Sequence, residues 1–336
     1  MNFRKLGSSD IEASVIGFGA WAIGGWMWGG TEEQDAIDAI NTAIDNGVNL
    51  IDTAPMYGYG RSEEIIGKAI KGKRNKIVLA TKCGLVWDTS DWKEGKGELH
   101  FYSDNDTIVK ENKNTIRVYK YLRPESIRKE IEQSLKRLNT DYVDLLQTHW
   151  QENTTPLEDT IGELEKLKKE GKIRTIGCSN VNLKQLNIYI KSEQLDVDQE
   201  RFSLIDKNII NDGLLDACDK ANVSVFAYSP LANGLLTGKI TPQRQFGKGD
   251  LRTTNQRFSP ENIQKINKKL ELLSPIANAH NITITQLIIA WTAAKYKKMH
   301  VLCGMRNTKQ AAENAKAGNI TLTENETNEI ENKFKE

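Results

Sequence analysis

The chain alternates short apolar segments with longer stretches in which apolar residues recur every three or four positions. The first pattern is typical of buried strands and the second of amphipathic helices. The segments that predict strands are Val15–Phe18, Val48–Ile51, Ile77–Thr81, Val143–Gln147, Thr175–Cys178, Val197–Gln199, Val223–Tyr228 and Val301–Cys303. The helical segments are Glu33–Asn46, Ser62–Lys71, Pro124–Leu138, Leu157–Glu170, Leu183–Ser192, Gly213–Ala221 and Thr308–Ala315, with two more helices expected within Pro260–Ala294.

Eight strand–helix units predict an α/β protein built as one closed (β/α)8 barrel (TIM barrel) over residues 1–336. Before the first unit, Phe3 to Ser14 alternates around Gly7–Asp10 and predicts an N-terminal β-hairpin. After the third strand comes a long insert, residues 84–122, which contains Trp87, Trp92 and other aromatic residues. Loops of this length are usually functional or disordered, and the aromatic residues favour an ordered flap over the active-site face. A hairpin packed on the barrel rim is the alternative.

An open, doubly wound sheet is the competing fold. Gly17–Ala22 formally fits the dinucleotide fingerprint G-x-G-x-x-G/A after a strand. The indoles and glycines of Trp21–Gly30 make a poor opening for a tightly packed helix, and Asp52 comes later than the fingerprint requires. We therefore expect a bulky loop at the barrel mouth, with indoles lining a pocket.

Composition narrows the class of protein. Hydrophobic residues make up 38% of the chain, and the net charge of +1 gives no reason to expect nucleic acid or an anionic membrane as a partner. Four separated cysteines without a CxxC pair fit a reducing cytosol. The N-terminal residues contain no apolar signal segment, and no run reaches membrane-spanning length. We expect a cytoplasmic enzyme, a monomer by default.

Four ionisable residues fall at or just beyond the ends of neighbouring strands: Asp52, Tyr57, Lys82 and His149. In a barrel the carboxyl ends of parallel strands surround one mouth, so these side chains should meet there. Each residue alone has an ordinary structural explanation. The aspartate could cap a helix, the lysine could reach solvent, and the histidine could simply be packed in the core. Together, on one face, they predict a catalytic group.

Their residue types suit proton transfer to a carbonyl oxygen. A tyrosine hydroxyl is a weak acid at neutral pH, and the ammonium of Lys82 should lower its pKa. Asp52 can hold Lys82 in place, and His149 can hydrogen-bond a substrate oxygen from the other side. No side chain supplies a hydride, so carbonyl reduction would require a nicotinamide cofactor.

The sequence resembles the aldo-keto reductases over essentially its whole length. The segments that carry the resemblance are Gly17–Trp21, Asp52–Gly58, Ala80–Lys82, His149–Trp150, Gly177–Asn180, Tyr228–Leu231 and Gly304–Arg306. Within the family, Trp21–Gly25 and Gly234–Lys239 are similar to the bacterial general-stress and inositol-cluster reductases. The resemblance implies NADPH-dependent reduction of an aldehyde, ketone or sugar-like carbonyl, with the cofactor extended across the strand ends.

The resemblance also implies residue roles. Tyr57 would be the general acid, Lys82 the group that adjusts its pKa, Asp52 the partner of Lys82, and His149 the residue that orients the carbonyl. The implied cofactor-binding residues are Ala20, Trp21, Asp52, Ser179, Asn180, Gln199, Tyr228, Ser229, Leu231, Gly234, Leu236, Gly238, Lys239, Gly304, Arg306, Gln310, Glu313 and Asn314. A substrate pocket is expected from Trp21, Met56, Tyr57, Tyr59, Trp87, His149 and Trp150.

Two of the implied cofactor loops have physical support of their own. The segment Gly234–Lys239 can approach phosphates closely and ends in a cation, although an ordinary glycine-rich turn would look the same. Gly304–Asn307 follows the eighth strand and opens a helix, where barrels often bind phosphate. Arg306 there suits a 2′-phosphate, so we expect NADPH to be preferred over NADH. Arg252 is a second candidate, with a pairing to Asp or Glu as its alternative.

Two departures from the family pattern concern the substrate side. Many relatives have Pro-Asp where this chain has Gln151-Glu152, and the insert 84–122 is longer than is usual in the family.

No G-x-S-x-G elbow and no HExxH spacing occur, so neither a serine nucleophile of that kind nor a metal site is expected. Two other functions stay open: an NADPH-binding, redox-sensing regulatory module with little turnover, and an isomerase or aldolase using Lys82 as a Schiff-base amine.

Overall fold

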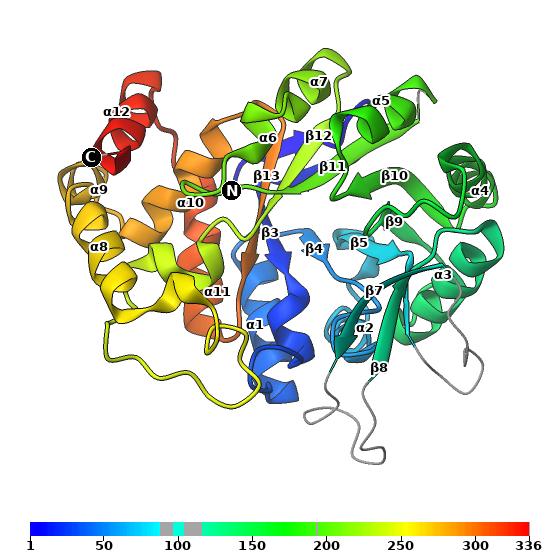
Figure 1. Ribbon diagram of the computed structural model, residues 1–336, viewed down its shortest axis with the longest axis horizontal. Helices are drawn as coiled ribbons and strands as arrows, with labels where there is room; N and C mark the ends of the chain where they lie inside the picture. Colours follow the sequence, from blue (N-terminus) through cyan, green and yellow to red (C-terminus); the bar gives the residue numbers. More distant parts are fainter. Residues whose placement is uncertain (88–96, 104–115, 193, 336) are drawn as a thin grey trace.

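Eight parallel strands form a closed barrel in this computed structural model, which describes residues 1–87, 97–103, 116–192 and 194–335 (Figure 1). Neighbouring strands follow one another in sequence order, and the last pairs with the first. The strands are β3 (Ile16–Gly19), β4 (Leu50–Asp52), β5 (Val78–Cys83), β9 (Val143–Thr148), β10 (Ile173–Ser179), β11 (Leu195–Arg201), β12 (Ser224–Tyr228) and β13 (Met299–Gly304). The predicted (β/α)8 barrel is confirmed, and the open doubly wound sheet is wrong because the sheet closes.

Helices cover the outside of the barrel. The predicted ones are α1 (Glu33–Asp45), α2 (Arg61–Ala69), α3 (Pro124–Leu138), α4 (Leu157–Lys169), α5 (Leu183–Lys191), α7 (Leu214–Lys220) and α11 (Thr308–Lys316). Two more α-helices, α6 (Asn208–Asn211) and α12 (Glu324–Lys335), and five 3-10 helices, η1 (Ala20–Gly24), η2 (Arg74–Lys76), η3 (Ala232–Thr237), η4 (Gln256–Phe258) and η5 (Ala317–Asn319), complete the described chain. Helix α12 was not predicted from the sequence, because it buries little more than Ile330 and Phe334.

The stretch Pro260–Ala294 forms three helices, not the predicted two: α8 (Pro260–Glu271), α9 (Ser274–Ala279) and α10 (Ile284–Ala294). A second break falls after α9, where Asn281 has a left-handed φ of 53°. Thr283 then caps α10 in a capping box with Gln286. The apolar periodicity continues through both breaks, so it does not reveal them.

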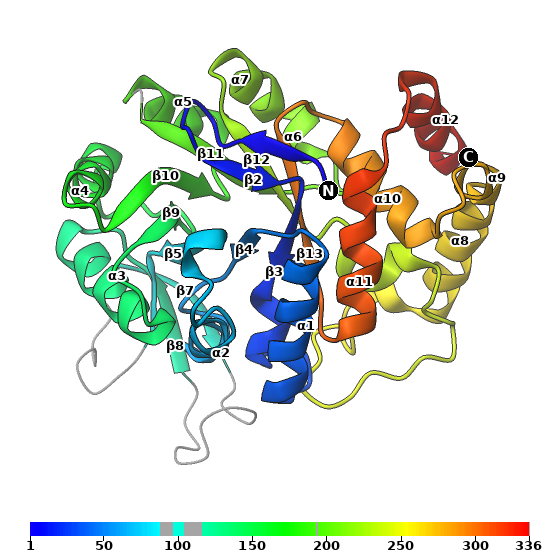
Figure 2. The same ribbon diagram turned by 180° about the vertical axis from the view of Figure 1, so that it is seen from behind.

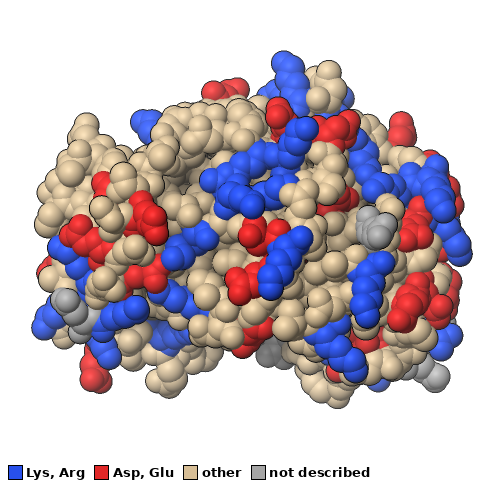
Figure 3. Space-filling model, turned by 90° about the horizontal axis from the view of Figure 1, so that it is seen from above, with Lys and Arg blue, Asp and Glu red and all other residues tan. Residues whose placement is uncertain are grey.

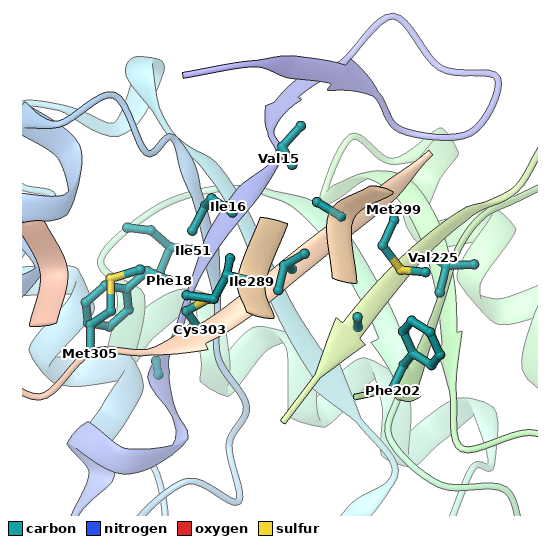
Figure 4. Packing of buried hydrophobic residues seen from close by; sticks show 14 of the residues in the cluster. Val15, Ile16, Phe18, Ile51, Phe202, Val225, Ile289, Met299, Cys303 and Met305 are labelled. Carbon is teal, nitrogen blue, oxygen red and sulfur yellow. The ribbon is translucent and has the colours of Figure 1, made fainter. Parts of the chain in front are cut away.

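The strands separate two apolar layers. Ile16 and Phe18 point outward into the main core, where side chains from β12, β13 and α10 join them (Figure 4). Inside the barrel lies a second cluster that includes Leu50, Leu145 and Phe226. Because side chains alternate along a strand, the residues that follow this inner cluster also face the interior, at the carboxyl ends of the strands.

An N-terminal hairpin closes the other end of the barrel. Strands β1 (Phe3–Lys5) and β2 (Glu12–Ser14) pair in antiparallel fashion, as predicted, and lie at the top of the barrel in Figures 1 and 2. Leu6, Ile11 and Ala13 pack on the inner cluster. Lys and Arg are interspersed with Asp and Glu over this end of the molecule (Figure 3). Among the described residues, no helix has the length and apolarity needed to cross a membrane.

The insert 84–122 contains an antiparallel sheet of three strands, β6 (Leu85–Trp87), β8 (Ile116–Lys120) and β7 (Glu98–Ser103), in that order. The Oγ atom of Ser103 accepts hydrogen bonds from Trp26 Nε1 at 3.0 Å and from Tyr59 OH at 2.7 Å. These bonds join β7 to the loops after the first two barrel strands. Trp92 lies outside the described residues.

Two glycines bring the loops of η1 and Tyr57 together. Gly58 has φ 71°, and a Cβ atom added to it would lie 2.3 Å from the carbonyl oxygen of Gly24. A Cβ atom on Gly24 would lie 2.6 Å from the carbonyl oxygen of Tyr57. Only glycine therefore allows this approach, which fixes the loop that carries Tyr57.

We expect Gly58→Ala to destabilise the protein by about 3 kcal/mol or more, because both backbone strain and a backbone clash must be accommodated. The matched control is Gly72→Ala, since Gly72 has φ 74° but nothing within 4 Å of an added Cβ. That variant should cost only about 1 kcal/mol. Urea unfolding of both variants measures the difference, and equal losses would contradict the role of the close contact.

Candidate active site

The interior positions change from apolar to polar at the carboxyl ends of the strands. On five of the eight strands the next inward position, two residues later, is polar: Leu50 is followed by Asp52, Ala80 by Lys82, Leu145 by Gln147, Val197 by Gln199, and Phe226 by Tyr228. Parallel pairing sets Asp52 beside Ala80, and Lys82 beside Gln147. The strands therefore present a ring of polar side chains above the inner apolar cluster.

Lys82 is the centre of this ring. Its Nζ atom donates to Asp52 Oδ2 at 2.7 Å, to the carbonyl oxygen of Thr53 at 2.9 Å and to Tyr57 OH at 3.1 Å. The side chain is 0% exposed, so the ammonium depends on these three acceptors, one for each of its hydrogens. The structure thus brings Asp52, Tyr57 and Lys82 together as the sequence predicts.

Two glutamines complete the environment of Asp52. Its Oδ1 atom accepts from Gln147 Nε2 at 3.1 Å and from Gln199 Nε2 at 2.9 Å. Gln199 was expected to bind the cofactor, and its amide nitrogen here donates to the carboxylate of Asp52. Gln147 was missed by sequence reasoning, although its inward position two residues after Leu145 is a signal that could have identified it.

The pKa of Tyr57 is raised well above its usual value, first by burial and then by the charge of Asp52. This reverses the expectation that Lys82 would lower it. Burial removes the phenol from water and disfavours the phenolate. The carboxylate of Asp52 also lies against the same ammonium, so the field of Lys82 is largely offset. Tyr57 therefore keeps its proton at neutral pH and can donate it.

His149 stands on the other side of the Tyr57 ring, with ring centroids 5.7 Å apart and the planes nearly perpendicular. Burial lowers the pKa of His149 well below its usual value, with contributions from Lys82 and His100. The imidazole is consequently neutral at physiological pH. In that state one ring nitrogen carries a hydrogen and can donate it to an oxygen.

A cavity of about 760 Å³ opens above these residues. Most of the sequence-predicted residues line it: Ala20, Trp21, Asp52, Met56, Tyr57, His149, Trp150, Ser179, Asn180, Gln199, Tyr228, Ser229, Leu231, Gly234, Lys239, Gly304, Arg306, Gln310, Glu313 and Asn314. Lys82, Tyr59, Leu236, Gly238 and Trp87 are not part of this lining. Trp87 packs behind Tyr59, at 5.4 Å between centroids, so the insert brings other residues to the wall.

Asn180 connects the predicted catalytic residue His149 with the predicted cofactor residue Tyr228. It adopts a left-handed φ of 56°, its Nδ2 atom donates to the carbonyl oxygen of His149 at 2.9 Å, and its Oδ1 atom accepts from Tyr228 OH at 2.8 Å. Ser179 Oγ donates to the carbonyl oxygen of Gln199 at 2.7 Å. The ring of Tyr228 is thereby fixed beside a cluster of amide and hydroxyl groups.

The loop after β12 offers a concave backbone. Ser229, Ala232, Asn233 and Gly234 have positive φ values of 55°, 46°, 57° and 95°. Loops with consecutive residues of this kind can make anion-binding concavities; here the N–H groups of Ala232 and Gly234 donate to the carbonyl oxygens of Ser229 and Leu231 at 2.9 Å each. Trp21 and Trp28 also line the cavity, and their buried indole nitrogens have no partner within the described ranges. Both features fit an elongated ligand that carries phosphate groups.

Cations gather at the far end of this loop. Arg306 donates from Nη2 to the carbonyl oxygen of Gly30 at 2.6 Å, while Lys239 pairs with Glu313 at 2.6 Å. Arg252 is held by Asp250 through Nε at 2.9 Å and Nη2 at 2.6 Å, the pairing weighed as its alternative. Of these three cations, Arg306 is the one that has no carboxylate within ion-pair distance among the described residues.

Several cavity residues were not predicted from the sequence. Arg201 follows Gln199 by two positions and could have been found by strand alternation. Trp26 and Trp28 belong to the indole-rich loop that was expected to line a pocket. His100 and Phe101 come from the insert, whose strand register the sequence does not reveal.

Comparison with known proteins agrees with this geometry. A family model described as the aldo/keto reductase family matches residues 15–335. The chain is 40% identical over 325 residues to the NADH-specific methylglyoxal reductase of Escherichia coli, covering 95% of this chain and 94% of that protein. It is 36% identical to aldo-keto reductase YhdN of Bacillus subtilis, with 87% and 81% covered.

Solved structures are similar over nearly the whole chain. The glycerol dehydrogenase AKR11B4 from Gluconobacter oxydans superposes with a TM-score of 0.84 at 34% identity, covering 98% of this chain and 94% of that one. An aldo-keto reductase from Klebsiella pneumoniae in complex with NADPH gives 0.69 at 25% identity, covering 99% and 96%. On this evidence the chain belongs to the aldo/keto reductase family and is an oxidoreductase that acts on carbonyl compounds with a nicotinamide cofactor.

Proposed function

We propose that this protein is an NADPH-dependent reductase of aldehydes and ketones in which Tyr57 is the general acid. The observation that carries the proposal is the hydrogen bond from Lys82 Nζ to Tyr57 OH, 3.1 Å long, at the base of the cavity. It turns the phenol oxygen toward a buried cation while the phenolic hydrogen remains available to a carbonyl oxygen above it. The nicotinamide ring, when bound, supplies the hydride.

The protein's own residues would act in a defined order. The imidazole of His149 donates a hydrogen bond that orients the carbonyl oxygen over Tyr57. As negative charge develops on that oxygen, Tyr57 transfers its proton. The resulting phenolate is stabilised by the ammonium of Lys82, which Asp52 keeps in position. Tyr228, Ser179 and Asn180 would hold the nicotinamide ring and its carboxamide.

The geometry gives no support to the Schiff-base alternative. Burial lowers the pKa of Lys82 below its usual value, and Asp52 opposes this shift through charge and a hydrogen bond, so what disfavours a Schiff base is the set of contacts of the ammonium and its lack of access to the substrate. All three ammonium hydrogens have acceptors, and Lys82 does not line the cavity. A Schiff-base amine must be deprotonated and accessible to the substrate.

Replacement of Tyr57 by Phe should lower kcat by about 10²-fold to 10⁴-fold, because the proton donor is lost. Cofactor affinity should change by less than about twofold, since the ring remains in place. The control is Tyr59→Phe, which removes a neighbouring hydroxyl that bonds Ser103 and not Lys82. Steady-state reduction of an aldehyde panel measures both variants. Unchanged turnover in Tyr57→Phe, or negligible turnover in the wild type as a sensor would show, would contradict the proposal.

The raised pKa of Tyr57 predicts opposite pH dependences for the two reaction directions. Reduction needs the protonated phenol, so kcat/KM for the carbonyl should stay level from about pH 6 to about pH 9. Oxidation of the alcohol needs the phenolate and should therefore become faster as pH rises through that range. Stopped-flow or steady-state pH profiles in both directions test this, and a reduction rate that falls between about pH 7 and 8 would contradict it.

The preference for NADPH rests on Arg306. An arginine with few compensating charges can bind a 2′-phosphate through charge-assisted hydrogen bonds. Arg306→Ala should weaken NADPH binding by about 10-fold to 100-fold and NADH binding by less than about threefold. Tryptophan fluorescence is a suitable signal, because Trp21 and Trp28 line the cavity.

The control for this experiment is Lys309→Ala, which removes one exposed positive charge from α11, the helix that follows Arg306. It should leave the ratio of the two affinities unchanged. If Arg306→Ala weakened the binding of NADPH and NADH equally, the main contribution of Arg306 to cofactor binding would instead be its hydrogen bond to Gly30. Tighter binding of NADH by the wild type would place this protein with its NADH-specific relative and refute the NADPH preference.

A further inference from the structure

A β-bulge in the insert turns two side chains toward the cavity. On β7, Leu99 pairs with Tyr119 of β8, but the next paired residue is Phe101, which faces Val118. His100 is therefore an extra residue with no opposite partner. Bulges of this kind re-aim side chains and are frequent beside active sites. His100 and Phe101 both line the cavity.

A row of aromatic rings extends from His100 toward Tyr57 and His149. The imidazole of His100 lies 5.0 Å from the ring of Trp150 and 5.1 Å from that of Phe101. Phe101 in turn stacks on Trp26, at 5.8 Å with an interplanar angle of 14°. Since Trp150 directly follows His149, these rings form one continuous wall between the insert and the catalytic residues.

The bulged strand is held firmly on both sides. Ser103 accepts hydrogen bonds from Trp26 and Tyr59, and Glu98 receives Lys120 Nζ at 2.6 Å. Ionic and polar contacts at the two ends of β7 therefore fix the position of His100. Figure 1 shows β7 on the opposite side of β3 from the segment that follows η3. The described part of the insert thus lies away from Lys239 and Arg252, which line the cavity.

The chemistry of this wall selects an uncharged ligand. Beside His100, the described residues lining this side of the cavity are Trp26, Met56, Leu85, Phe101 and Trp150, none of which carries a charge. Burial lowers the pKa of His100, with a further contribution from Lys120, so its imidazole is neutral. In the part of the chain that the structure describes, its ring nitrogens make no hydrogen bond. A neutral imidazole offers one donor and one acceptor, which matches a hydroxyl group.

We propose that the insert forms a second substrate-binding subsite, in which His100 hydrogen-bonds a hydroxyl group remote from the reacting carbonyl carbon. The preferred substrates are then uncharged carbonyl compounds that place an apolar or ring-shaped middle section along Trp26, Phe101 and Trp150 and a hydroxyl at the far end. This inference rests on the proposed function, because it assigns the reacting carbonyl to Tyr57 and His149.

The test uses pairs of aldehydes that differ only in the remote group. The meta and para isomers of hydroxymethylbenzaldehyde are compared with the corresponding ethylbenzaldehydes, which have the same shape without the hydroxyl. For the wild type with NADPH, kcat/KM for at least one hydroxylated isomer should exceed that of its ethyl counterpart by about fivefold to tenfold. His100→Phe should reduce this ratio to about one and leave kcat/KM for the ethyl compounds within about threefold.

Two further variants separate this role from a structural one. His100→Gln keeps a donor and an acceptor and should retain part of the hydroxyl preference. Tyr102→Phe changes an exposed side chain on the same strand and should retain all of it. Thermal unfolding checks that each variant is folded.

The outcomes distinguish the two proposals. If the wild type reduces neither kind of aldehyde, the proposed function fails. If it reduces both kinds equally well, or if His100→Phe slows both by the same factor, the subsite is refuted while the reductase stands.

Discussion

The buried ion pair between Lys82 and Asp52 is the interaction on which the rest of the site depends. Removing two charges from water is costly, and the cost is offset only when geometry is good and the remaining donors and acceptors are satisfied. Here the ammonium has three acceptors, and Asp52 accepts further bonds from Gln147 and Gln199. These groups come from four strands, β4, β5, β9 and β11, so the pair is satisfied only when the barrel is closed in the correct register. Fold and chemistry are specified together.

Because the fold and the site depend on the same strands, parts of both could be predicted from the sequence. Strands were predictable because buried parallel strands are short apolar runs, and Asp52 and Lys82 were predictable because each ends such a run. Strand alternation would also have identified Gln147 and Arg201. The sign of the pKa shift at Tyr57 was not predictable, since it depends on how completely the assembled loops exclude water. His100 was hidden for a related reason, because a bulge is defined by the register of a partner strand.

The position of Tyr57 depends on the geometry of the loop after β4. Tyr57 lies beyond its strand, so no sheet hydrogen bonds hold it, and its position relative to Lys82 must be set by loop packing. The mutual approach of Gly24 and Gly58 supplies this, with a separation that leaves no room for a Cβ atom. The hydroxyl of Ser103 links the same region to the insert through Trp26 and Tyr59. Tyr57 and the aromatic wall are therefore positioned by one connected set of contacts.

Charged side chains are distributed unevenly around the cavity, and this distribution affects how substrates can be distinguished. Lys239, Arg244, Arg252 and Arg306 line it from segments that follow β12 and β13, whereas the insert side carries no charge among its described lining residues. Cations that bind phosphate groups strengthen cofactor binding but do not distinguish one carbonyl substrate from another. Discrimination must then come from contacts made by the substrate itself. Among the described residues, such contacts are offered near Tyr57 and His149 and along the aromatic wall that ends at His100. Substrate choice is therefore expected to depend on the insert together with the barrel loops that carry Trp26 and Trp150.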